Sequence, residues 1–170
     1  SPSGMGLYIY DRDGFKIIDC VFDNFDYGIY LNDSRHGDLI NVTINNSDVD
    51  GLVLEDESND VRMKGIQVIN TKGDNAIWFD GDEWSASEVS GNLIEDSVIR
   101  KSTSAELVWI NWGLNNEFRR SNFSESPSGQ YGVYINGHNN IGNFDINDNI
   151  IFSNGVGLYL YNSKNNDFNR

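Results

Sequence analysis

The sequence predicts an all-β solenoid, a single domain of about seven stacked coils that each add one strand to a common parallel sheet. A four-residue strand pattern occurs seven times in 170 residues. Its copies begin 22, 23 or 25 residues apart, with one longer interval of 31. Periods of this length are typical of repeats that stack on their neighbours. The copies are residues 6–9 (GLYI), 28–31 (GIYL), 51–54 (GLVL), 76–79 (AIWF), 107–110 (LVWI), 132–135 (GVYI) and 157–160 (GLYL).

Each copy alternates with period two, so its second and fourth residues share one face of the strand. These residues are always aliphatic or Phe, and we expect them to face the interior. The third residues then point outward, and we expect the same of the first, where Gly allows a bend. With coils about 4.8 Å apart, the third residues form a column on a rod roughly 30 Å long. The column is Tyr8, Tyr30, Val53, Trp78, Trp109, Tyr134 and Tyr159.

The remaining segments of each coil follow in order. Coil one continues through residues 15–22, coil two through 39–44 and coil three through 61–69, each with short alternating runs that predict a roughly triangular coil. Coil four is the long one, and we expect its extra residues at 80–88, directly after the strand. Asn recurs at the expected turns, where it tolerates left-handed backbone and can bond from coil to coil. These residues are Asn45, Asn46, Asn59, Asn70, Asn115, Asn116, Asn139, Asn140, Asn165 and Asn166.

Three segments of the chain resemble the parallel β-helix repeat: residues 28–34 (GIYLNDS), 132–140 (GVYINGHNN) and 157–166 (GLYLYNSKNN). This repeat belongs to the right-handed, pectin-lyase-like superfamily, including its short-repeat NosD/CASH-type branch. The resemblance covers essentially the whole chain and implies a right-handed, single-stranded parallel β-helix. The superfamily holds polysaccharide lyases, glycoside hydrolases, epimerases, phage tailspikes and binding modules, so the fold alone does not select an activity. The resemblance is compatible with a disaggregatase-type domain or a tailspike-type domain.

The amino-acid composition limits the partners that we expect this chain to bind. Twelve Lys and Arg against 26 Asp and Glu give a net charge of −14, so we expect no nucleic-acid partner, which would need a basic stripe. No apolar run reaches transmembrane length, and we expect no membrane insertion. The acidity suits a secreted or surface protein, a calcium-rich setting or a salty cytoplasm and does not decide between them; with a glycan as the expected target, we expect an extracellular or cell-surface location. Only five residues precede the first copy and no capping element is visible, so we expect residues 1–170 to be one domain excised from a longer chain.

A pair of carboxylates is the leading candidate for the catalytic site. Glu55 and Asp80 each follow a strand directly, on adjacent coils, so their backbones should lie about 5 Å apart. Two carboxylates this close repel, and one should hold its proton to higher pH. A general acid beside a nucleophile or base needs this arrangement, and a short separation favours the retaining geometry of glycosidases. Asp82 lies in the same turn region and joins the catalytic candidates.

Two other interpretations of these acids remain open. Asp82 and Glu83 would bind calcium, which accepts irregular oxygen-rich loops, or the acids form only a solvated turn. Lyase chemistry would instead need groups that neutralise a uronate and move a proton, for which Arg35, His36 and His138 are candidates. Sugar rings would stack on the aromatic side chains of Tyr30, Trp78, Trp109, Trp112 and Tyr134.

The sequence therefore predicts a polysaccharide-active domain, a glycoside hydrolase or a uronate lyase, that acts on an acidic cell-envelope or extracellular glycan. Calcium is the one cofactor considered. The acidic charge argues against a polyanionic substrate unless calcium bridges the two. The alternative is a non-catalytic carbohydrate-binding or structural module of a surface protein, with the aromatic column buried in a homotrimer.

Overall fold

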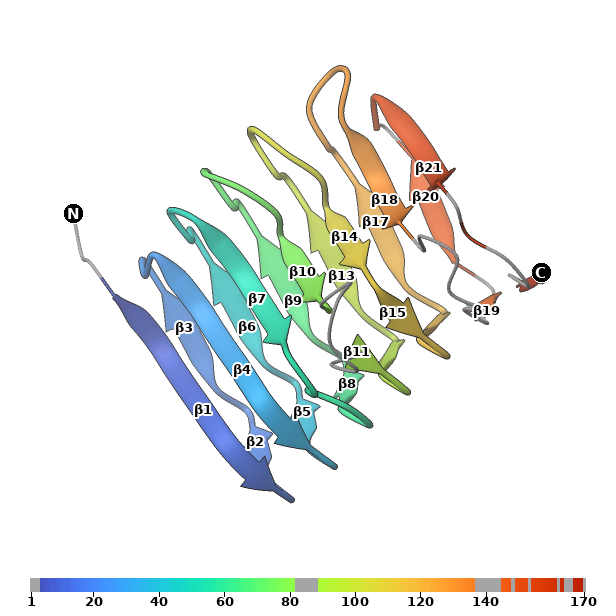
Figure 1. The fold of residues 1–170 in the computed structure, drawn as a ribbon. Coiled ribbons are helices and arrows are strands. Elements are labelled where there is room, and N and C mark those ends of the chain that lie inside the picture. The colour runs from blue at the N-terminus through green and yellow to red at the C-terminus, as the bar shows by residue number, and fades with distance from the viewer. Residues whose placement is uncertain are drawn as a thin grey trace.

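The computed structural model describes residues 4–81, 89–136, 145–147, 149–152, 154–161, 163 and 167–169. Its regular elements in these ranges are all strands, wound coil upon coil into an elongated stack with the termini at opposite ends (Figure 1). This part of the chain holds no helix of the length and apolar character needed to cross a membrane. Asp82, Glu83 and His138, which the sequence nominates for the site, lie outside the described residues.

Within the described residues, the coils build three parallel sheets, called here sheets 1, 2 and 3; all seven coils contribute a strand to sheets 1 and 2, and the first six contribute one to sheet 3. Sheet 1 consists of β1 (Met5–Asp13), β4 (Tyr27–Arg35), β7 (Asp50–Glu55), β10 (Ile77–Asp80), β14 (Val108–Asn111), β18 (Tyr131–Asn136) and β21 (Val156–Tyr161). These seven strands carry the seven copies of the predicted pattern in a single sheet, in chain order, as expected for a solenoid; only Ala76 and Leu107, the first residues of their copies, lie just before β10 and β14.

The two shorter sheets complete the triangle. Sheet 2 consists of β2 (Lys16–Ile18), β5 (Asp38–Ile40), β8 (Arg62–Lys64), β12 (Leu93–Glu95), β16 (Glu117–Arg119), β19 (Asp145–Asn147) and β22 (Asp167–Asn169). Sheet 3 consists of β3 (Val21–Asp23), β6 (Thr43–Asn45), β9 (Gln67–Ile69), β13 (Val98–Arg100), β17 (Asn122–Ser124) and β20 (Ile150–Phe152). A small pair, β11 (Val89–Ser90) with β15 (Gly113–Leu114), lies beside them.

The hydrophobic core fills the inside of the triangular coils, and its sheet 1 residues are those that the sequence pattern predicts to face inward. The inward residues of β4, β7 and β10 have no exposed surface, and Leu39, Met63 and Phe118 from sheet 2 meet them there. The connection from β10 to β12 is longer than the one from β7 to β8, so the extra residues of the long coil fall where they were expected.

Glycine at the first position of the pattern does not face outward as predicted. A Cβ on Gly28 would lie 2.2 Å from Cγ2 of Ile44, and one on Gly51 would lie 2.4 Å from Cγ1 of Val68. The bend into each strand therefore points the α-hydrogens of these glycines at the core side chains of sheet 3. Period-two alternation breaks at this bend, and the residue before the glycine is free to return to the outer face.

The corners use residues that tolerate left-handed backbone. Asp33, Asp56 and Trp112 occupy equivalent corners, each directly after the aligned residues Asn32, Glu55 and Asn111 of sheet 1, with φ of 46°, 54° and 58°. Most other positive-φ residues are also Asn or Asp, because their short polar side chains bond locally. Coil-to-coil bonding of the predicted kind occurs where Asn70 Nδ2 donates to Asn45 Oδ1 at 3.1 Å. The turn Asn residues in the described ranges are therefore structural in part, as expected.

Candidate functional site: the outer face of sheet 1

The aromatic column forms with the predicted register. Strand pairing aligns Tyr30 with Val53, Val53 with Trp78, and Trp78 with Trp109. The alignment continues to Tyr134 and Tyr159, so third residues stand coil above coil along sheet 1.

Ring packing makes the C-terminal part of the column, from Trp78 to Tyr159, continuous. The rings of Trp78 and Trp109 are stacked at 6.1 Å, and those of Tyr134 and Tyr159 at 5.4 Å with an interplanar angle of 6°. Trp109 meets Tyr134 edge-on at 5.9 Å. The smaller Val53 is fully buried and separates this run from Tyr30. From Trp78 to Tyr159, four adjacent coils thus present an aromatic surface of the kind that sugar rings stack on.

The two leading carboxylates are neighbours, as the sequence predicted. Asp80 pairs with Glu55 across adjacent strands, beside Trp78 and Val53. Glu55 Oε2 accepts a hydrogen bond from Tyr30 Oη at 2.6 Å and another from Asn32 Nδ2 at 2.8 Å. Burial raises the pKa of Tyr30, and so does its bond to Glu55, so this phenol remains a neutral donor. These two donors fix one oxygen of Glu55 in place.

Amide side chains continue this row on the other side of Asp80. Asn136 Nδ2 donates to Asn111 Oδ1 at 3.2 Å, and Asn111 Nδ2 donates to Asp80 Oδ1 at 3.4 Å. The row beside the aromatic column therefore runs from acid to amide along the stack. Amides and carboxylates beside aromatic rings can bind sugar hydroxyls in both directions, as donors and as acceptors.

Arg35 lies in coil two and is already engaged by acids. Its Nη2 pairs with Asp33 at 3.1 Å and forms a second, shorter ion pair with Glu57. Beside it, His36 Nδ1 lies 2.6 Å from Asp13 Oδ1, and this contact raises the pKa of His36. A small hollow of about 160 Å³ lies among these side chains. The predicted uronate partner is thus neutralised within the chain.

Trp112 does not join the column. It follows β14 at a corner, has φ of 58°, and its side chain is almost fully buried. Its predicted role as a sugar contact stays a prediction, and the geometry gives that role less support than it gives to Trp109.

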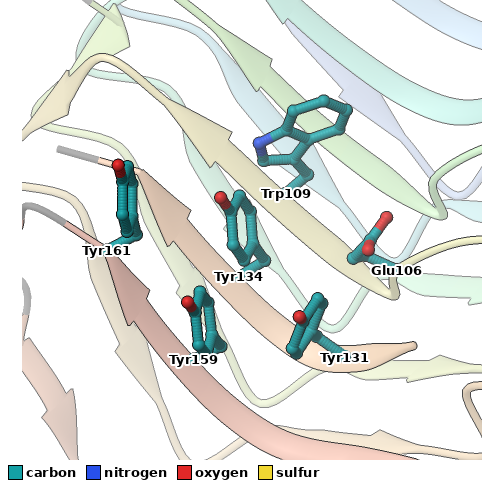
Figure 2. Close-up of a pocket in the computed structure, with 6 residues that line it drawn as sticks. All are labelled: Glu106, Trp109, Tyr131, Tyr134, Tyr159 and Tyr161. Atoms are coloured by element: carbon teal, nitrogen blue, oxygen red, sulfur yellow. The ribbon is translucent and has the colours of Figure 1, made fainter. Parts of the chain in front are cut away.

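A second set of outward residues was missed by the sequence reading. Glu106 and Tyr131 each stand one residue before the first position of the pattern, where strict alternation would place them inward. With Trp109, Tyr134, Tyr159 and Tyr161 they line an open hollow of about 370 Å³ (Figure 2). The available signal was the recurrence of polar or aromatic residues at this offset, Tyr27, Asp50, Glu106 and Tyr131, just before the bend.

Two carboxyl groups at this offset have raised pKa values. Burial raises the pKa of Asp50 to about 7, although the backbone N–H of Asn75 donates to its Oδ1 at 2.8 Å and lowers the pKa in part. Burial also raises the pKa of Glu106, and the nearby charge of Asp74 adds to the effect. Within the described residues, no group of three or more His, Cys, Asp or Glu side chains is arranged to hold a metal ion.

Comparison with known proteins identifies the fold. The family profile described as "Right handed beta helix region" matches residues 4–170, which confirms the right-handed β-helix expected from the repeat. A mutant of the periplasmic alginate epimerase AlgG superposes with a TM-score of 0.77 at 16% identity, over 94% of this chain and 36% of the epimerase. The alginate lyase from Paenibacillus sp. str. FPU-7 superposes with a TM-score of 0.54 at 15% identity, over 95% of this chain and 76% of the lyase.

These likenesses concern the fold. The chain spans about a third of the epimerase's length. A search of curated protein sequences finds no match.

Proposed function

Because the chain belongs to the right-handed β-helix family, we propose that it is a polysaccharide-active domain that binds a glycan along the outer face of sheet 1. The observation that carries the proposal is the aromatic run from Trp78 to Tyr159, in register on four coils, with the Glu55–Asp80 pair beside it. Coil spacing in the sheet is close to the length of one sugar ring, so successive rings of a glycan would meet successive aromatic side chains.

In this proposal the two carboxylates divide the proton work. Tyr30 and Asn32 hold Glu55 in position as the nucleophile or charge-stabilising group, and Asp80 serves as the general acid. Their backbones are paired on adjacent strands, about 4.8 Å apart, and carboxyl groups held at a similar separation would have the retaining arrangement. Glycoside hydrolysis is therefore the reaction that these residues support best.

Uronate lyase chemistry receives less support. It needs a positive group for the uronate, and the seven strands of sheet 1 contain only two basic residues, Arg12 and Arg35. Arg35 is paired with Asp33 and Glu57. The acidic glycan expected from the sequence would thus need a bridging cation. Two structural neighbours act on alginate and one is periplasmic, and an extracellular or envelope location for this chain is part of the proposal.

A panel of neutral, acidic and amino-sugar polysaccharides tests the proposal, with new reducing ends and the absorbance of unsaturated uronate as readouts. Wild type should release reducing ends from at least one glycan, and Asp80→Asn and Glu55→Gln should lower the rate roughly 10²- to 10⁴-fold. Asp38→Asn, the same change on sheet 2, should keep the wild-type rate. A wild-type chain that cleaves no glycan, with or without calcium, refutes the catalytic part.

A second candidate is a non-catalytic glycan-binding or adhesive module. It is favoured by the side-chain bonds within the row, where Glu55 is tied to Tyr30 and Asn111 to Asn136, an arrangement that suits static recognition of hydroxyls. Such a module would bind glycan without cleavage, or would bury the column in a homotrimer. Light scattering distinguishes the trimer from a monomer whose column is free.

A further inference from the structure

The hollow of Figure 2 differs in chemistry from the rest of the outer face. Five aromatic side chains and a single carboxylate surround it, from three successive coils. Tyr134 lies at its centre, with Tyr161 on one side and Glu106 on the other, as their places in the register also require. Tyr131 packs against both Tyr134 and Tyr159, at ring distances of 5.2 Å and 4.9 Å. The hollow is therefore lined by aromatic rings that pack against one another and hold one another in place.

Glu106 has no counterion of its own. No ion pair reaches it within the part of the chain that the structure describes. The buried acid Glu95, by contrast, is paired with cations, since it contacts Arg62 at 2.5 Å and Arg120 at 2.9 Å. A partly buried carboxylate without a cation is costly to maintain, which is also why its pKa is raised.

The charge of the described residues around the hollow disfavours an anionic ligand. The five strands β7, β10, β14, β18 and β21 contain no Lys, Arg or His, while Asp50, Glu55, Asp80 and Glu106 lie on or next to them. The whole chain has a net charge of −14. A polyanion would meet repulsion here, and these strands offer it no cationic partner.

Aromatic faces carry a negative quadrupole and attract cations, most strongly when the cation is partly removed from water. The same faces stack on the apolar side of a sugar ring. We propose that this hollow is a subsite for a sugar with a positively charged amino group, a 2-amino-2-deoxyhexose, whose ring lies on Tyr134 and whose ammonium group is held between Glu106 and the aromatic rings. The proposal rests on the proposed function, since it names the substrate class of that same face.

Calorimetry with four tetrasaccharides tests the subsite: tetraglucosamine, its fully N-acetylated form, cellotetraose and a uronate tetramer. The acetylated form keeps the ring and removes the charge. Tetraglucosamine should bind about tenfold more tightly than the acetylated form, the strength of a partly desolvated cation–π and carboxylate contact. The difference should shrink in high salt and disappear at a pH that deprotonates the amine.

Variants assign the preference to the hollow. Glu106→Gln should lower tetraglucosamine affinity about tenfold and leave the acetylated tetramer unchanged. Tyr134→Ala should weaken both, because both stack on the ring. Asp23→Asn on β3, which removes the same charge from sheet 3, should change neither.

The outcomes separate the two proposals. Equal affinity for the amino and acetylated tetramers, tighter binding of the uronate, or a preference that survives Glu106→Gln overturns the amino-sugar subsite, while any glycan binding lost in Tyr134→Ala still supports the proposed function. If no tetrasaccharide binds, the proposed function fails and the subsite with it.

Discussion

Asn92, directly before β12 of sheet 2, bonds from coil to coil, and its removal gives the sharpest test of how the coils are held together. Its Oδ1 accepts a hydrogen bond from the backbone N–H of Val61 at 2.9 Å, and its Nδ2 donates to the carbonyl of Ser58 at 3.1 Å. The side chain is 1% exposed. It therefore bridges its own coil to the preceding one inside the protein.

Asn92→Ala leaves one buried N–H and one buried carbonyl without these partners. An unsatisfied buried group costs about 1–3 kcal/mol, and carbonyl groups are the less costly of the two. We therefore expect a loss of about 2–4 kcal/mol in the free energy of unfolding, a large part of the stability of an ordinary domain.

Urea denaturation followed by circular dichroism measures this loss. Asn45→Ala is the matched control, because Asn45 bonds Asp23 and Asn70 from coil to coil at the partly exposed surface of sheet 3. It should cost less than about 1 kcal/mol, since water replaces the lost bonds. If Asn92→Ala is no more damaging than Asn45→Ala, the argument that buried side-chain amides hold the coils together is wrong.

Three further predictions concern the core and the outer face. The pKa of Asp50 is raised by burial to about 7, from 3.8, so the stability that Asp50 contributes should be fully present below about pH 4 and be lost as pH rises through 7; Asp50→Asn should remove this loss from the pH dependence of the urea midpoint, and an unchanged pH dependence contradicts it. Phe118→Ala should cost about 3–5 kcal/mol in the same assay because the ring is fully buried, and a loss under about 1 kcal/mol would count against the core assignment. Tyr30→Phe removes the hydroxyl bonded to Glu55 and should lower glycan cleavage without lowering the free energy of unfolding by more than about 1 kcal/mol; full activity would show that Tyr30 does not position Glu55.

The inward face and the register could be predicted from the sequence because the alternation tolerates no slip. A shift of one residue would expose Ile29 and Leu54 to water and bury Tyr30, so only one register satisfies every coil. The same register fixes Glu55 beside Asp80 without any knowledge of side-chain conformation. Both features are confirmed.

The hollow lined by Glu106 and the aromatic side chains could not be predicted from the sequence, because it depends on a backbone bend at the first position of the repeated pattern. Period-two counting continues through the first position of the pattern and so assigns Glu106 and Tyr131 to the core. The structure turns the chain at that position, with Gly51 directed against Val68, and the count restarts. The burial of Trp112 could not be predicted either, since its corner shares the backbone conformation of Asp33 and Asp56, and that conformation does not show that the indole is buried.

The most direct test of the account is a crystal structure of the chain with the tightest-binding oligosaccharide of the panel. If glycan binds along the outer face of sheet 1, we expect sugar rings stacked on Trp109 and Tyr134, with a ring edge within reach of Glu106. A glycan bound on sheet 2 or sheet 3, or an aromatic column covered by a second copy of the chain, would contradict it.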